Sequence, residues 1–399
     1  MRKIGFLVAG VAALGLALAQ SNVIKIATMS PLSGPQAALG EQIKLGAELA
    51  VEEAKERFKA LGFELVLVPY DDQANPDVGV ANANRMINDP DILGLVGTLN
   101  SGVAIPASEV LARVNLVMVS PANTNPVVTD RKLPNVNRIV GRDDVQGPAA
   151  AEFVYNDLKL RRVFVIHDKT AYGQGLAEEF RKRFEALGGR VVAFIGTEEQ
   201  SNFVPIINQI RAQNPQLVYF GGIYSQIGPF TKQLRERGLR MPLMGGDGLD
   251  SSEFERLAGS QNAKGAYYTT VAGPVSAFPQ AKALAERFKA KYGKDIEGFG
   301  IYAYDAARVI LAALENAIKA NGGKKPTRAQ VAQEVRKVKL EGITGTIEFD
   351  SKGDIKKAKY FVMQVAGTGN WADNKLIKVI EVAAPFGATP SAGKRRRPC

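Results

Sequence analysis

The stretch ILGLVGTLNSGVAIPASEVLARVNLVMVSPANTNPVV, residues 92–128, decides the fold class. Apolar runs at 92–96 and 116–119 predict two strands, and a helix-length segment at 104–113 lies between them. Strand, helix and strand in this order predict a parallel βαβ unit, because parallel strands need a crossover connection. The polar turns that follow the two strands then lie together at the carboxyl edge of the sheet, where open α/β sheets bind ligands.

These two polar turns, residues 97–102 and 120–124, supply hydroxyl groups, backbone N–H groups and a helix N-terminus. Groups of this kind suit a small anionic part of a ligand. A turn rich in hydroxyls also serves as an ordinary helix cap. This stretch alone therefore leaves a binding role and a capping role open.

The same alternation of strands and helices continues along the chain. Strands are predicted at 23–28, 63–69, 138–141, 162–167, 190–195, 217–220, 242–245 and 265–271. Helices are predicted at 37–61, 77–88, 147–158, 176–187, 203–212, 228–237, 278–292, 300–320 and 328–338, and a hairpin joins 345–350 to 360–365. The order predicts an α/β protein with doubly wound parallel sheets. With 399 residues, two such lobes are favoured over a single core.

The first 19 residues have the pattern of a secretory signal peptide. Arg2 and Lys3 precede an apolar run at 4–18, which ends in the small residues around Ala19. The run is short for a membrane span. No cysteine follows it to accept a lipid anchor. We expect cleavage after Ala19 and a soluble periplasmic protein rather than a lipoprotein.

Cysteine content and charge exclude several classes of protein. The single cysteine is Cys399, so an intrachain disulfide, a cysteine-based metal site and a catalytic thiol are excluded. The net charge is +11, and four of the cations lie together at 394–397 in a tail, 388–399, that is predicted to be disordered. The tail is interpreted as a solvated end, with contact to an anionic lipid or polymer as the alternative. No nucleic-acid partner is expected.

Six segments occur in the following order: SPLSGPQAALGEQIKLGAELAVEEA, PYDDQANP, VGTLNSGVAIPAS, VSPANTNP, IHDKTAYGQGLAEEF and LMGGDG. In sequence and in separation they resemble the periplasmic leucine/isoleucine/valine-binding proteins of ABC importers, over residues 23–365. The resemblance implies a type I periplasmic binding protein, with two Rossmann-like lobes joined by three hinge crossings. Lobe one would take 22–141 plus 270–346, and lobe two 142–269 plus 347–385. The crossings would lie near 140–141, 269–271 and 346–349.

The resemblance also implies roles around a bound amino acid. Ser101 would donate to the ligand carboxylate, the Ala122 carbonyl would accept from the ammonium, and Thr124 would contact both charged groups. From the other lobe, Tyr172 would close the cleft and Asp247 would pair with the ammonium. Asp247 follows a predicted strand and is flanked by glycines, so a functional role is favoured for it even without the resemblance. A zwitterion needs donors at one end and acceptors at the other, as this set provides.

The sequence departs from the family pattern around the ligand's side chain. Leu39 and Ile223 replace aromatic residues, whereas Phe299 remains aromatic, and Asp247 stands where the best-known members have glutamate. The family's cysteine pair is replaced by Asn75 and Asn100. The nature of the ligand side chain therefore stays open. The complete set of candidate ligand-binding residues is Leu39, Ser101, Ala122, Asn123, Thr124, Tyr172, Ile223, Tyr224, Asp247 and Phe299.

Other polar residues are assigned structural roles. His167 is the single histidine, and without a cysteine or a second histidine we expect capping or packing rather than catalysis. The adjacent residues Asp71 and Asp72 would point to opposite faces of a strand end, which favours loop fixing over an acid/base pair. Trp371 is assigned to packing.

The sequence thus predicts a solute-binding protein that works by closure of a cleft on its ligand. It would capture a branched-chain or other aliphatic amino acid and deliver it, as a monomer, to an inner-membrane ABC permease. No cofactor and no metal are expected. The alternatives are a binding protein for an amide, a urea-like compound or another small acid, and an exported α/β enzyme, which the lack of a nucleophile–base pair disfavours.

Overall fold

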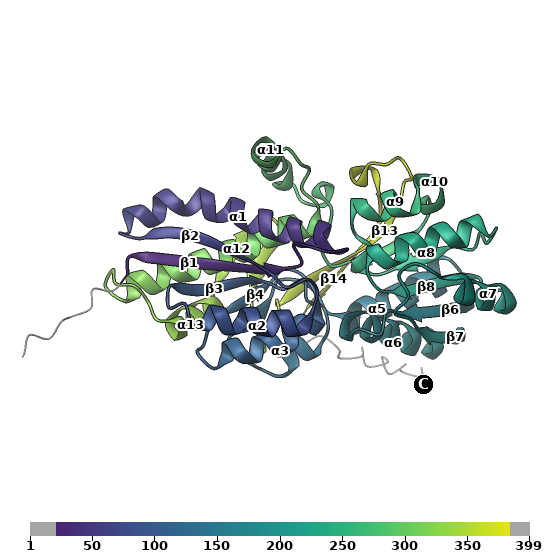
Figure 1. Cartoon of the computed structure of the whole chain (residues 1–399), viewed down its shortest axis with the longest axis horizontal. Coiled ribbons are helices and arrows are strands. Elements are labelled where there is room, and N and C mark those ends of the chain that lie inside the picture. The colour runs from purple at the N-terminus through teal and green to yellow at the C-terminus, as the bar shows by residue number, and fades with distance from the viewer. Residues whose placement is uncertain (1–20, 384–399) are drawn as a thin grey trace, which may run out of the picture.

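The computed structural model describes residues 21–383, so the predicted signal peptide at 1–19 and the predicted disordered tail at 388–399 lie outside the described residues. Two α/β units lie side by side along the long axis of the molecule, each built on its own sheet (Figure 1). Within residues 21–383, no helix combines the length and the apolar character that crossing a membrane requires.

The first sheet has five strands, and all its neighbouring strands are parallel. The strands are β1 (Val23–Ser30), β2 (Glu64–Asp71), β3 (Ile92–Gly97), β4 (Met118–Ser120) and β5 (Val136–Arg138). Their order across the sheet is β2-β1-β3-β4-β5. The winding therefore reverses between β1 and β3, and ligands of doubly wound sheets bind at such a reversal.

The second sheet repeats this order and adds two strands. Its strands are β6 (Arg162–His167), β7 (Arg190–Gly196), β8 (Leu217–Gly221), β9 (Leu243–Gly245), β10 (Tyr267–Thr270), β13 (Lys357–Gln364) and β14 (Lys375–Ala383). The order is β14-β13-β10-β9-β8-β6-β7, in which β13 and β14 run antiparallel to their neighbours. A separate hairpin pairs β11 (Lys339–Gly342) with β12 (Gly345–Glu348).

The helices pack on both faces of each sheet. They are α1 (Ala37–Ala60), α2 (Pro76–Ile87), α3 (Ser101–Ala112), α4 (Val127–Asp130), α5 (Asp143–Glu152), α6 (Ala171–Ala186), α7 (Val204–Gln213), α8 (Tyr224–Glu236), α9 (Ser252–Ala258), α10 (Ser260–Ala263), α11 (Ala281–Tyr292), α12 (Gly298–Ala320) and α13 (Arg328–Lys337). Short turns of other helix types are η1 (Phe153–Asp157), η2 (Asp247–Leu249), η3 (Val275–Ala277) and η4 (Trp371–Asp373).

The alternation of side chains along β1 separates the two layers of the first unit. Ile24 and Ile26 pack in the same apolar cluster as α1 and α12, whereas Ala27 and Met29 pack with α2 and α3. Figure 1 shows α1 along one side of this sheet and α2 and α3 along the other. Because both faces of the sheet are covered, β1, β3, β4 and β5 are mostly or fully buried, whereas the edge strand β2 is largely half-exposed.

Two glycines bring the turns at these strand ends close to the neighbouring backbone. A Cβ on Gly97, which ends β3, would overlap the carbonyl oxygen of Met29 in β1. A Cβ on Gly248, in η2 after β9, would overlap the carbonyl oxygen of Gly222 after β8. Only glycine therefore allows these turns to lie against the adjacent strands, which positions the residues that follow them.

The structure corrects two predicted elements. Residues 345–350 do not form a hairpin with 360–365, because β12 pairs with β11 and β13 lies between β10 and β14 in the second sheet. The last strand, β14, was not predicted. The helix predicted at 104–113 begins at Ser101, so the polar turn itself forms its first residues. The predicted α/β class with two doubly wound sheets is confirmed.

Candidate functional site

A small cavity lies between the two units, where strand ends of both sheets meet. The residues around it follow β3, β4, β8 and β9 or begin α1, α6 and α12. They are Leu39, Leu99, Asn100, Ser101, Ala122, Thr124, Tyr172, Ile223, Asp247, Gly248 and Phe299. The cavity thus collects eight of the ten predicted ligand-binding residues from seven separate places in the chain.

The first unit contributes uncharged polar groups. Ser101 begins α3, and its Oγ accepts a hydrogen bond from the backbone N–H of Asn125 at 3.2 Å, which leaves the hydroxyl proton for another acceptor. Ala122 and Thr124 follow β4, and both are almost fully buried. The backbone N–H of Ala122 is fixed by the Oγ of Ser120 at 3.1 Å. This wall offers a helix N-terminus and hydroxyl groups to a small anion.

The second unit contributes the charge. The hydroxyl of Tyr172, in α6, donates to Oδ1 of Asp247 at 2.6 Å and accepts from the N–H of Gly248 at 2.8 Å. Among the described residues that line the cavity, Asp247 alone has a charged side chain. Burial raises the pKa of Asp247, although its hydrogen bonds from Tyr172 and Gln146 oppose this. A cation from a ligand would restore the ionised form.

A second buried carboxyl group, that of Asp143, lies behind the wall that holds Asp247. The sequence did not predict it. Nε2 of Gln146 donates to Oδ1 of Asp143 at 2.9 Å and to Oδ1 of Asp247 at 3.0 Å, so one amide bridges the two acids. Oε1 of Gln146 accepts from the hydroxyl of Thr269 at 3.0 Å. Oδ2 of Asp143 lies 2.9 Å from Oγ1 of Thr124. Burial, and then the charge of Asp247, raise the pKa of Asp143 well above its usual range.

Apolar side chains close the rest of the cavity. Leu39, Ile223 and Phe299 lie there as the sequence predicts, and Leu99 adds a fourth apolar side chain. All four are buried. The cavity is therefore divided into a polar part and an aliphatic and aromatic part, which is the usual build of a small-molecule site.

Two predicted residues do not line the cavity. Asn123 fixes the turn after β3, because its amide donates to the Thr98 hydroxyl and to the Leu99 carbonyl at 3.1 and 3.0 Å. The hydroxyl of Tyr224 donates to the carbonyl of Pro35 at 2.9 Å and accepts from the N–H of Ala38 at 3.3 Å. A ligand contact by these two residues stays a prediction.

The Tyr224 bonds are among several that join the two units around the cavity. The amide of Asn125 donates to the carbonyl of Ala171 at 2.7 Å. The N–H of Ser252 donates to Oε2 of Glu297 at 3.3 Å. Bonds of this kind on several sides of a small cavity describe a closed cleft.

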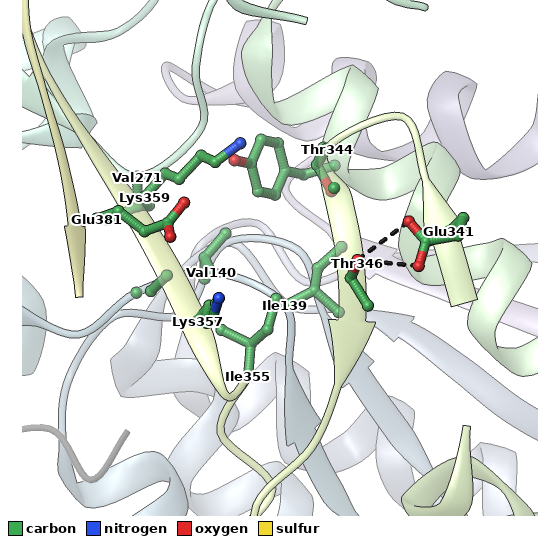
Figure 2. A pocket seen from close by; sticks show the side chains of 14 residues that line it. Ile139, Val140, Val271, Glu341, Thr344, Thr346, Ile355, Lys357, Lys359 and Glu381 are labelled. Atoms are coloured by element: carbon green, nitrogen blue, oxygen red, sulfur yellow. Dashed lines mark hydrogen bonds between the residues drawn. The ribbon is translucent and has the colours of Figure 1, made fainter. Parts of the chain in front are cut away.

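A larger hollow has a different composition (Figure 2). It is lined by residues 139–141, 271 and 344–346, which lie at or next to the crossings predicted near 140–141, 269–271 and 346–349, and by residues of β13 and β14. Four charged side chains face it, namely Glu341, Lys357, Lys359 and Glu381, and the hydroxyl of Thr346 donates to Glu341 (Figure 2). None of the ten predicted ligand-binding residues lines it, so size alone does not mark the candidate site.

The residues assigned structural roles have local partners. Nδ1 of His167 accepts from the N–H of Lys169 at 3.1 Å. Asp71 accepts from the N–H of Leu32, and Asp72 accepts from the N–H of Ala74. These bonds confirm the predicted capping role of the histidine and the loop-fixing role of the two aspartates.

The chain belongs to the periplasmic binding protein family, whose family model matches residues 23–370. An amino acid binding protein of Pseudomonas aeruginosa is 35% identical over 368 residues, which cover 89% of this chain and 96% of that protein. The Leu/Ile/Val-binding protein BraC3 of Rhizobium johnstonii is 38% identical over 308 residues, or 77% of this chain and 83% of that protein.

A solved structure has the same fold over most of its length. The leucine binding protein LivK of Thermotoga maritima superposes with a TM-score of 0.80 and 31% identity, covering 90% of this chain and 98% of that one. The family predicted from the six sequence segments is therefore confirmed.

Proposed function

We propose that this protein binds a branched-chain or other aliphatic α-amino acid in the cavity between its two units and delivers it to an ABC permease. The observation that carries the proposal is the division of one closed cavity into three parts. One wall has hydroxyls at a helix N-terminus, the opposite wall has a single carboxylate, and apolar side chains fill the remainder.

The polar parts match the two charges of an α-amino acid. The ligand carboxylate would accept from Ser101, from Thr124 and from the N-terminus of α3, while its ammonium would donate to Asp247 and to the Ala122 carbonyl. Hydrogen bonds to charged groups contribute about 1.5–3 kcal/mol each. An uncharged amide or urea would leave the Asp247 carboxylate buried without a counter-charge, which is costly.

The apolar part supports an aliphatic side chain. Leu39, Leu99, Ile223 and Phe299 offer branched and aromatic surfaces without a polar group at their ends. Each buried methylene group of a ligand contributes about 0.8 kcal/mol there. The names of the similar proteins, which include leucine and Leu/Ile/Val-binding proteins, support the same class of ligand.

The mechanism is closure of two lobes on the ligand. Lobe one would comprise 22–141 plus 270–346, and lobe two 142–269 plus 347–385, with the crossings lining the hollow of Figure 2. A ligand that contacts both walls binds the closed form more tightly than the open form, so it shifts the population towards closure. The bonds of Tyr224 to Pro35 and Ala38 then hold the lobes together.

The cellular role follows from the family and from the predicted export signal. Cleavage after Ala19 would release a monomer into the periplasm, without a lipid anchor, where a permease recognises the closed form. We propose binding rather than catalysis, because the described lining residues include no histidine, cysteine or lysine, and their one hydroxyl–carboxylate pair, Tyr172 and Asp247, is assigned to closing the cleft and holding the ammonium. Neither a metal nor a cofactor is part of the proposal.

The test is a binding panel on the mature protein after unfolding and refolding to remove any bound ligand. Calorimetry should give the tightest binding with leucine, isoleucine or valine, and mass spectrometry should find one of them released from the untreated protein. Binding of an amide, a urea or an aromatic acid without an amino group, with no response to any aliphatic amino acid, would overturn the proposal.

A further inference from the structure

The carboxyl group of Asp143 has no role in the binding proposed so far. Asp143 is fully buried at the start of α5, and it does not line the cavity. It lies directly behind Thr124, however, with Oδ2 at 2.9 Å from Oγ1 of that threonine. The backbone N–H of Asp143 also donates to the Thr124 carbonyl at 2.9 Å, which fixes the two residues against each other.

The threonine hydroxyl has a single proton to give. If Asp143 is ionised, the Thr124 proton points to Asp143, and only lone pairs of Oγ1 face the cavity. A ligand carboxylate would then meet an oxygen without a proton, with a second negative charge close behind it. If Asp143 is protonated, its O–H donates to Oγ1, and the threonine proton is free to point at the ligand carboxylate.

The surroundings of Asp143 favour the protonated form. The ionisable groups that face it are Asp247, Arg138 and three tyrosines, Tyr172, Tyr219 and Tyr360. Asp247 places a negative charge close to Asp143, because one amide, that of Gln146, donates to both carboxyl groups. Arg138 gives little compensation, because its Nε donates to Asp354 and its Nη1 to the carbonyls of Asn123 and Asn125.

We propose that Asp143 keeps its proton and acts as a positioning residue that turns the Thr124 hydroxyl towards the carboxylate of the bound ligand. This inference rests on the proposed binding of an amino acid in the cavity. It gives the two buried acids opposite tasks. Asp247 is ionised and faces the ligand ammonium, whereas Asp143 is neutral and supports, through one hydroxyl, the site of the ligand carboxylate. Binding of the ligand carboxylate strengthens the preference for neutral Asp143.

Three variants test the direction of the hydrogen bond. Asp143→Asn preserves the proposed pattern, because its amide N–H donates to Thr124 and its carbonyl accepts from Gln146. Asp143→Ala removes the donor. With leucine as the probe in calorimetry at pH 7, we expect Asp143→Ala to bind at least tenfold more weakly and Asp143→Asn to rescue this loss. In the Asp143→Asn background, Thr124→Val should weaken leucine binding at least tenfold. In the Asp143→Ala background, it should weaken leucine binding little further, because residues 143 and 124 act as one unit.

A spectroscopic measurement covers the case in which Asp143→Ala does not fold. The infrared difference spectrum of wild type minus Asp143→Asn at pH 7, with leucine bound, should contain the carbonyl band of a protonated carboxylic acid. A carboxylate band in its place would overturn the inference, and so would Asp143→Asn binding as weakly as Asp143→Ala. If wild type binds no amino acid, the proposed function fails instead, and the ligand-free difference spectrum still decides the protonation state of Asp143.

Discussion

The two walls of the cavity differ in the groups that they would offer to the two opposite charges of the proposed ligand. The wall from the first unit uses Ser101, Ala122 and Thr124, whose donors and acceptors stay uncharged. The wall from the second unit uses Asp247, held by Tyr172 in an interior that disfavours its charge. Closing the cleft without a ligand buries this carboxylate unpaired, at a cost of several kcal/mol. In the proposed function, the second wall would couple closure to the arrival of a cation, and the first wall would fix the ligand's orientation.

Removal of the charge on the second wall should have the largest effect. Asp247→Asn keeps the shape of the side chain and its bonds to Tyr172 and Gln146 but leaves the ligand ammonium without an ionic partner. Loss of one member of a buried charge pair costs about 2–5 kcal/mol, or roughly 30-fold to several thousandfold in affinity. Calorimetry with leucine should show this loss, with the fold retained by circular dichroism.

The matched control is Asp250→Asn. Asp250 is also a buried aspartate, three residues further along, but its oxygens accept from Trp371 and Thr270 and it does not line the cavity. Its substitution should leave the affinity within about threefold of wild type, well below one tenfold step of 1.4 kcal/mol. Equal losses in the two variants would mean that the effect of Asp247 is not specific to the ligand.

Changes in the first wall should have smaller effects. Ser101→Ala and Thr124→Val each remove one hydroxyl and leave the backbone of the wall in place. A hydrogen bond to a charged group contributes about 1.5–3 kcal/mol, so each variant should bind roughly 10–100-fold more weakly. Thr124→Ser is the control, because it keeps the hydroxyl. A larger loss in these variants than in Asp247→Asn would reverse the proposed division of labour between the walls.

Loss of a hydrogen bond that joins the two walls outside the cavity should have a still smaller effect on leucine binding. Tyr224→Phe removes the hydroxyl that bonds to Pro35 and Ala38. A neutral hydrogen bond is worth about 0.5–1.5 kcal/mol, so we expect the dissociation rate of leucine in stopped-flow measurements to rise about two- to tenfold. Tyr292→Phe is the control, because its hydroxyl donates to Glu48 within the first unit at 3.0 Å. An unchanged dissociation rate in Tyr224→Phe would exclude a role of this contact in keeping the cleft closed.

The residues that follow strand ends were predictable from the sequence. Ser101 and Thr124 lie in polar turns after apolar runs, and Asp247 follows a strand between glycines, so the rule for parallel sheets brings them to one edge. Leu99 and Asn100 lie in the same turn and line the cavity, but they were not among the predicted ligand-binding residues. That the carboxyl edges of the two sheets face each other across a cleft was predicted from the resemblance to a family and not from periodicity.

Other features depend on packing that no local pattern contains. Asp143 and Gln146 precede the helix predicted at 147–158, and they reach the site because α5 begins at Asp143 and packs beneath the cavity. Tyr224 follows Ile223 directly, yet Ile223 lines the cavity while Tyr224 bonds to the opposite unit, since α8 begins between them. The turn residues around 351 predicted a hairpin between 345–350 and 360–365. In the structure, β13 pairs with β10 instead.

The rim of the first wall contains a titrating group of its own. Glu297 precedes α12, accepts from the N–H of Ser252 across the cleft, and has its pKa raised to about 7 by burial and by the charge of Asp250. The folded protein therefore binds more protons than the unfolded chain between about pH 4.5 and 7, so the free energy of unfolding falls as pH rises through this window. The slope from one such group is at most about 1.4 kcal/mol per pH unit.

Glu297→Gln should remove the contribution of this group to the slope and raise the stability of the closed, leucine-bound protein at pH 8. Denaturant unfolding between pH 5 and 8 measures both effects. Glu348→Gln is the control, because Lys356 lowers the pKa of Glu348 and its contribution changes only below this range. A pH dependence of Glu297→Gln that matches wild type would mean that closure does not hold Glu297 protonated. The titrating groups of the cleft would then be confined to the second wall and to Asp143. The two walls would then differ more in their response to pH than the structure indicates.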